Sequence, residues 1–167
     1  TEVLTDGLVI VDDRGRVVET VELESDRMEE QLAAMDSVVD RRGCLIMPGF
    51  IDGHAHAPQY AFTGTGMDLP LLEWLEQYTF PCEARFRDLD FAKKVFGKSV
   101  RRHLRYGTTT VSYFGSLQLE ANKLLVDVVR EAGQRALVGK VSMDRNSPEY
   151  YVEDTTKGLE EAEEFVK

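Results

Sequence analysis

Residues 48–56 read Pro48-Gly49-Phe50-Ile51-Asp52-Gly53-His54-Ala55-His56, a short apolar run that ends in two histidines separated by one residue. Alternate side chains of an extended strand point the same way, so this spacing predicts that Phe50, Asp52, His54 and His56 share one side of a strand. Two imidazoles on one side can reach a single metal ion. A catalytic zinc usually takes three protein ligands, so the pair predicts part of a metal site.

Strands and helices are predicted to alternate around this motif. Short strands are expected at Phe50–His54, Thr108–Phe114 and Arg135–Val141. Helices are expected after Asp68 as an N-cap, from Asp90 to before Gly107, from Leu119 to Ala132, and from near Thr155. This alternation is typical of parallel βαβ units in an α/β fold. The histidine pair then falls at the carboxyl end of a strand, where (β/α) barrels carry their active sites.

The first 44 residues follow a different pattern. Gly7–Val21 alternates around the turn Asp12-Asp13-Arg14-Gly15 and predicts a β-hairpin. Apolar residues from Asp26 to Met35 have helical spacing, and Val38-Val39 indicates a return to extended structure. We therefore expect a small β element over residues 1–44 and a separate α/β unit over residues 45–167.

Composition limits the classes of partner. The 167 residues are 43% hydrophobic and carry 20 basic against 30 acidic side chains, a net charge of -10 that disfavours nucleic acid and anionic membrane surfaces. The two cysteines form no CxxC pair, and no leader or long apolar span is evident, which favours the cytoplasm. The chain begins at Thr1 without a methionine and stops at Lys167 inside a Glu-rich helical stretch, so we expect a fragment.

The segment PGFIDGHAH resembles the first barrel strand of the amidohydrolase superfamily. The stretches HAPQY at 56–60, DLPLLEWL at 68–75 and YTFP at 78–81 narrow the resemblance to the guanine deaminases. The likeness continues to about residue 141 and is weak before Leu45. It implies an α/β fold that is an incomplete TIM (β/α)8 barrel, about the first three strands, preceded by part of a small β-sandwich domain.

The same resemblance implies the chemistry: hydrolysis of guanine to xanthine and ammonia by a metal-activated water, in purine catabolism. It implies one Zn²⁺, with iron as the alternative metal, held by His54 and His56, and guanine contact by His56, Ala57, Pro58 and Gln59. In the family, later strands supply two more histidines, an aspartate and a glutamate proton shuttle. We therefore expect no proton shuttle in this chain and no activity from the chain alone, and we expect the full-length protein to be a homodimer.

Three side chains have two interpretations each. The Gln59 amide can donate and accept in one plane, which suits a purine, although a solvated loop residue would look the same. Asp52 is a candidate to orient a metal-bound histidine, with a structural strand-end hydrogen bond as the alternative. Trp74, with Tyr78 one turn later, is a candidate pocket wall, although aromatic residues at this spacing are more often core.

Other polar residues favour structural roles. His103 lies in a basic helical run and is expected at the surface. Glutamates 160, 161, 163 and 164 are expected on a solvated helix face, opposite the apolar positions Leu159, Ala162 and Val166. Cys44 and Cys82 have no histidine partner at a recognisable spacing, so a thiolate nucleophile is unsupported.

Two further functions stay open. One is a metal-dependent amidohydrolase acting on a different heterocycle, such as a triazine, a pterin or an adenine nucleoside. The other is a non-catalytic, truncated or split chain that needs its missing half.

Overall fold

The computed structural model describes residues 3–4, 7–22 and 27–167. The chain divides into two units, Thr1–Met47 and Pro48–Lys167, and each is described by itself. None of the helices in the described ranges is long and apolar enough to cross a membrane.

The first unit contains the predicted hairpin. Strands β1 (Gly7–Val11) and β2 (Val17–Glu22) pair antiparallel, and helix α1 (Arg27–Ala33) follows. The Asp12 carboxylate holds the turn, because it accepts hydrogen bonds from the Arg14 and Arg16 backbone N–H groups at 3.0 and 2.8 Å. Val38-Val39 forms no strand, contrary to expectation, and Asp26 lies outside the described residues.

The second unit alternates strands and helices as predicted. Its elements are β3 (Phe50–His56), η1 (Ala57–Phe62), α2 (Leu71–Trp74), η2 (Leu75–Thr79), α3 (Phe80–Glu83), η3 (Ala84–Arg87), α4 (Leu89–Arg105), β4 (Thr108–Phe114), α5 (Leu119–Glu131), β5 (Arg135–Gly139), η4 (Glu149–Tyr151) and α6 (Thr155–Val166). The three strands form one parallel sheet in the order β3-β4-β5. The α/β prediction is therefore confirmed, and the described strands form an open sheet.

Most element boundaries follow local chemistry. The Asp88 carboxylate accepts the N–H groups of Asp90 and Phe91, which starts α4 one residue before the predicted position. Gly107 and Gly133 have positive φ angles of 83° and 67° just after α4 and α5, as helix-terminating glycines do. Asp154 caps α6 by accepting the Lys157 N–H.

Three further boundaries differ from the predicted ones. Strand β3 continues two residues further, to His56, and β5 stops at Gly139 instead of Val141. Asp68 does not cap a helix, because α2 begins at Leu71 with Pro70 in the N-cap position. From Leu71 to Glu83 the chain is continuously helical. The α-helical turn α2 is followed by the π-helical turn η2 and by a second α-helical turn, α3.

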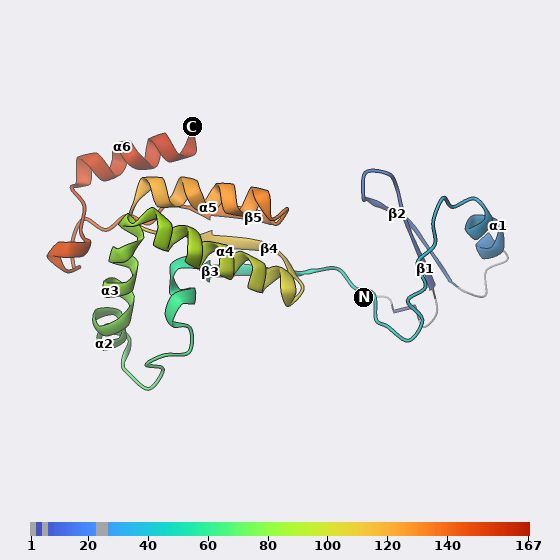
Figure 1. Cartoon of the computed structure of the whole chain (residues 1–167), viewed down its shortest axis with the longest axis horizontal. Helices are drawn as coiled ribbons and strands as arrows, with labels where there is room; N and C mark the ends of the chain where they lie inside the picture. The colour runs from blue at the N-terminus through green and yellow to red at the C-terminus, as the bar shows by residue number, and fades with distance from the viewer. Residues whose placement is uncertain (1–2, 5–6, 23–26) are drawn as a thin grey trace. The chain divides into compact units, whose positions relative to one another are not determined.

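The core lies between the sheet and two helices, α4 and α5, which run alongside the strands (Figure 1). Phe96 and Val100 of α4 and Leu125 of α5 are fully buried against Val111 and Tyr113 of β4. The opposite side of the sheet carries exposed apolar side chains, Ile51 at 75% and Leu137 at 73% exposure.

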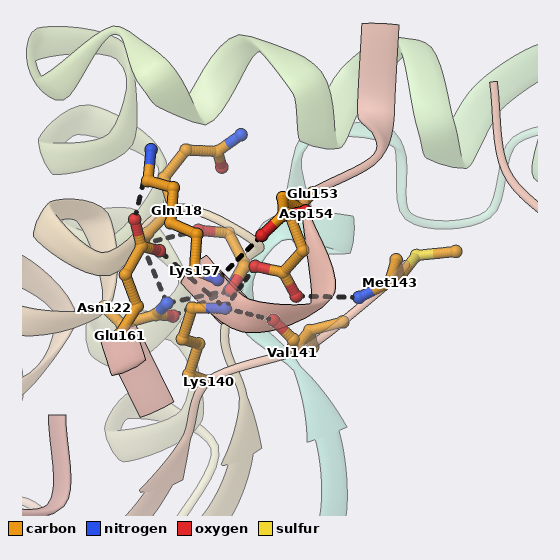
Figure 2. A network of polar contacts seen from close by, with 10 residues as sticks. Gln118, Asn122, Lys140, Val141, Met143, Glu153, Asp154, Lys157 and Glu161 are labelled. Carbon is orange, nitrogen blue, oxygen red and sulfur yellow. Dashed lines mark hydrogen bonds and ion pairs between the residues drawn. The ribbon is translucent and has the colours of Figure 1, made fainter. Parts of the chain in front are cut away.

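A buried polar network fastens the chain after β5 (Figure 2). Lys140 follows that strand, and its ammonium contacts Glu153 Oε2 at 2.7 Å and the Val141 carbonyl at 3.1 Å. Glu153 Oε1 accepts the Met143 N–H at 3.0 Å. A side chain at Gly158 would clash with the Glu153 carboxylate, because an added Cβ would lie 2.8 Å from its Cδ.

Candidate functional site

The two histidines of β3 converge at the carboxyl end of the strand. Their Nε2 atoms lie 3.2 Å apart, and their ring centroids are separated by 5.1 Å. Phe114, paired with His56 in the β3–β4 register, lies beside both rings at 4.5 and 4.8 Å. The strand therefore presents two imidazole nitrogens to one point, flanked by an aromatic ring.

This separation suits one shared metal ion. Two nitrogens at about 2.05 Å from a tetrahedral zinc would be about 3.3 Å apart. Partial burial, and then the neighbouring His54, lowers the pKa of His56, which favours the neutral imidazole that coordinates a metal. Among the residues described, no group of three or more His, Cys, Asp or Glu side chains is placed to hold a metal. The described chain therefore offers two ligands.

Asp52 does not lie on the side of the histidines, which corrects the expectation from strict alternation. The β3–β4 register shifts between Asp52 and Ala55, so Asp52 pairs with Val111 and Ala55 with Tyr113, both buried on the helix side. This irregularity reverses the alternation within β3. The Asp52 carboxylate accepts the His54 backbone N–H at 3.0 Å, which is the strand-end hydrogen bond of the structural interpretation.

His103 is not the surface residue that its basic neighbours indicated. Its side chain is 22% exposed, and its Nε2 lies 3.6 Å from Asp52 Oδ2. Its Nδ1 lies 3.0 Å from the Ser99 carbonyl and 3.2 Å from the Tyr113 hydroxyl. The signal was present in the sequence, because His103 follows Phe96 and Ser99 at the spacing of one buried helix face.

The residues predicted to contact a purine follow β3 directly. Ala57 and Pro58 are buried at the start of η1, and Gln59 is half-buried. The Gln59 Nε2 donates to Glu83 Oε1 at 3.4 Å, and the Tyr151 hydroxyl donates to Glu83 Oε2 at 2.5 Å. The loop after β3 is thereby joined to residues far along the chain.

Glu83 is a buried acid that the sequence did not single out. It is 4% exposed, and Tyr151 is 1% exposed. Burial raises the pKa of Glu83, while the hydrogen bonds from Tyr151 and Gln59 oppose that rise. No spacing rule relates a helix-end glutamate to a tyrosine 68 positions later, so only the tertiary structure identifies this cluster.

Trp74 and Tyr78 pack against the loop that precedes them. The indole N–H of Trp74 donates to the Thr65 carbonyl at 2.9 Å, and both rings lie near Phe62, with centroids at 5.5 and 6.5 Å. An added Cβ at Gly66 would lie 2.4 Å from the Tyr78 ring. These contacts give both aromatic residues a structural role in the described chain.

The remaining polar candidates stay outside the site. Cys44 is exposed and Cys82 half-buried, both as free thiols. Glutamates 160, 163 and 164 are exposed on α6, as expected, whereas Glu161 is partly buried and lies 4.0 Å from the Lys140 ammonium. The predicted apolar face of α6 is wrong, because Leu159 and Val166 are 68% and 84% exposed.

Comparison with known proteins defines the class. Residues 45–167 match the amidohydrolase family. The chain therefore belongs to the amidohydrolase family.

The similar proteins within that family include guanine deaminases, as the sequence resemblance predicted. The chain is 56% identical over 131 residues to guanine deaminase of Dictyostelium discoideum, covering 78% of this chain and 29% of that protein. It superposes with a TM-score of 0.87 and 36% identity on the crystal structure of guanine deaminase from C. acetobutylicum with bound guanine, covering 98% of this chain and 38% of that one.

A more distant solved relative is an adenosine deaminase from Xanthomonas campestris with bound zinc. The TM-score is 0.75 at 26% identity, over 97% of this chain and 35% of that one. The chain thus spans about a third of the length of these relatives, between 29% and 38%.

Proposed function

We propose that this chain is the amino-terminal part of a guanine deaminase, which hydrolyses guanine to xanthine and ammonia. The observation that carries the proposal is the convergence of His54 and His56 to an Nε2–Nε2 distance of 3.2 Å at the end of β3. The Dictyostelium and C. acetobutylicum guanine deaminases support guanine as the substrate.

The architecture proposed with it is a partial barrel. Strands β3, β4 and β5 are the first three of a TIM (β/α)8 barrel, within a unit of residues 45–167. Their exposed face, with Ile51 and Leu137, becomes the inner face once the later strands close the barrel. Residues 1–44, with the β1–β2 hairpin, contribute part of a small β-sandwich domain.

The proposed site residues have separate roles, which follow from where they lie. His54 and His56 supply two imidazole ligands to a divalent metal ion, and residues His56, Ala57, Pro58 and Gln59 contact the purine. The ion, when bound, supplies Lewis-acid activation of a water molecule for attack on the guanine carbon that bears the amino group. Phe114 packs beside both imidazoles.

Two of the proposed site residues have secondary roles. Asp52 fixes the backbone at the strand end through the His54 N–H, and so positions a ligand without touching its ring. Trp74 braces the loop through Thr65 and forms a wall behind the purine-contacting segment.

The metal, the cellular location and the oligomeric state are part of the same proposal. The metal is Zn²⁺, one per active site, as the zinc-bound adenosine deaminase relative suggests. The complete protein acts in the cytoplasm on a small molecule, as a homodimer, and needs neither nucleic acid nor membrane. Metal analysis of protein purified without added ions distinguishes zinc from iron.

The test compares two polypeptides: this chain alone, and the same chain continued into the carboxyl-terminal segment that its relatives possess. We expect zinc and xanthine formation from guanine in the continued polypeptide and no turnover by the chain alone. Turnover by residues 1–167 alone would mean that two histidine ligands suffice. Turnover of adenosine or a triazine in place of guanine would assign a different amidohydrolase.

A further inference from the structure

Glu83 joins three segments at the same end of the sheet. It ends α3, while Gln59 lies in η1 after β3 and Tyr151 lies in η4 after β5. Each Glu83 oxygen has its own donor, Gln59 Nε2 at 3.4 Å for Oε1 and the Tyr151 hydroxyl at 2.5 Å for Oε2. A carboxylate that is only 4% exposed is therefore paired on both sides.

This pairing determines which way the Gln59 amide points. A carboxamide carries two N–H donors on nitrogen and an acceptor on oxygen, and only the nitrogen can donate to a carboxylate. Glu83 therefore holds Nε2 toward itself and turns Oε1 away. Among the described residues, the contact with Glu83 is the one hydrogen bond of the Gln59 side chain, so its oxygen stays free to accept.

Tyr151 makes the arrangement rigid. It is 1% exposed and packs against Phe80 with ring centroids 5.8 Å apart, so its hydroxyl approaches Glu83 from a fixed direction. With one oxygen held by Tyr151, the other stays in place for Gln59. Through Glu83, the position of Tyr151 in η4 thus determines where the Gln59 side chain of η1 is held.

We propose that Glu83 is a positioning residue for substrate recognition: it orients the Gln59 carboxamide so that Oε1 accepts a hydrogen bond from a ring N–H of the substrate. This inference rests on the proposed function, in which Gln59 contacts the purine. A heterocycle with an N–H at that edge is accepted, and one with an unprotonated ring nitrogen there meets another acceptor and is disfavoured.

The variants are made in the polypeptide continued into the carboxyl-terminal segment. Glu83→Met removes both acceptor oxygens at nearly the same volume, and Glu83→Gln keeps a carbonyl that can accept from Gln59. We expect Glu83→Met to raise KM for guanine about fivefold, the size of one hydrogen bond, with kcat little changed. Glu83→Gln should keep KM within about twofold of wild type, because one acceptor suffices.

Two further variants separate positioning from folding. Glu83→Met removes the acceptor of the Tyr151 hydroxyl, whose oxygen also has a hydrogen bond with the Leu117 backbone, so Glu83→Met/Tyr151→Phe removes the stranded O–H donor as well. It should show the same rise in KM. In a Gln59→Ala background, Glu83→Met should change KM no further, because the residue through which it acts is gone.

Each outcome is decisive. Wild-type deamination of guanine, with a KM effect of Glu83→Met that disappears in the Gln59→Ala background, supports the inference. An equal effect in both backgrounds, or none in either, overturns it and leaves the proposed function intact. Absence of guanine turnover by the wild-type polypeptide overturns the proposed function and this inference together.

Discussion

Replacing Lys140 by methionine tests whether the buried network after β5 stabilises the fold as its geometry implies. The Lys140 side chain is 2% exposed and pairs at 2.7 Å with Glu153, which is 10% exposed (Figure 2). Methionine fills the same space but leaves the Glu153 carboxylate buried without its cation. Breaking a buried ion pair from one side costs about 3–5 kcal/mol, and we expect a loss of that size in the free energy of unfolding.

Lys157 provides the matched control. It also pairs with a glutamate, Glu161, at 3.5 Å, but its side chain is 70% exposed. Exposed ion pairs of this kind contribute about 0–1 kcal/mol, so Lys157→Met should be nearly neutral. The Lys140 ion pair is thus buried and shorter than that of the exposed Lys157, and the Lys140 ammonium also lies 4.0 Å from the Glu161 carboxylate.

Urea denaturation of the continued polypeptide measures both losses, and hydrogen exchange localises them. The Met143 N–H donates to Glu153, so its protection should fall in Lys140→Met and persist in Lys157→Met. Lys140→Met/Glu153→Gln neutralises the stranded charge and should recover most of the loss. Equal, small losses for the two lysine variants would refute the reasoning, because Lys140 would then have to be solvated.

Three other changes have defined outcomes. His56→Ala should abolish bound zinc and guanine deamination in the continued polypeptide, while its unfolding midpoint should match that of the metal-free wild type; retained zinc by metal analysis would make the motif structural. Burial raises the pKa of Glu83, so its stabilising contribution is complete below the ordinary glutamate pKa and is lost as the pH rises through the raised value. The stability of Glu83→Gln relative to wild type should therefore increase as the pH rises from below the ordinary glutamate pKa, and a difference independent of pH would contradict this sign. An added Cβ at Gly115 would lie 1.9 Å from Asn122 Oδ1, so Gly115→Ala should cost about 2 kcal/mol or more by urea denaturation, whereas Gly139→Ala, whose Cβ would lie 3.9 Å from its nearest neighbour, should cost less.

Local patterns predicted much of this protein. Strand β4 matches its predicted bounds, and the hairpin of the first unit forms where Asp12 and Gly15 favour a turn. The convergence of His54 and His56 could be predicted because a period of two places both on one side of a strand. These features depend on residues that are neighbours in sequence, so they can be predicted from composition and spacing.

The side on which Asp52 points was decided by pairing with β4. Strict alternation grouped it with the histidines, but the register shift turned it toward Val111 and His103. That shift depends on how β3 fits the neighbouring strand, which no local pattern encodes. His103 was placed wrongly for a related reason, because its charged neighbours concealed its position on a buried helix face.

The sequence by itself determined the order of strands and helices, the candidate metal-ligand pair and the family, since each depends on residues close together in the chain. Only the tertiary structure decided which acid supports Gln59. Glu83 lies 24 positions from Gln59 and 68 from Tyr151, and the three meet because parallel strands bring their following loops to one end of the sheet. Burial makes the hydrogen bonds of Glu83 with Gln59 and Tyr151 necessary, because a carboxylate removed from water must be hydrogen-bonded.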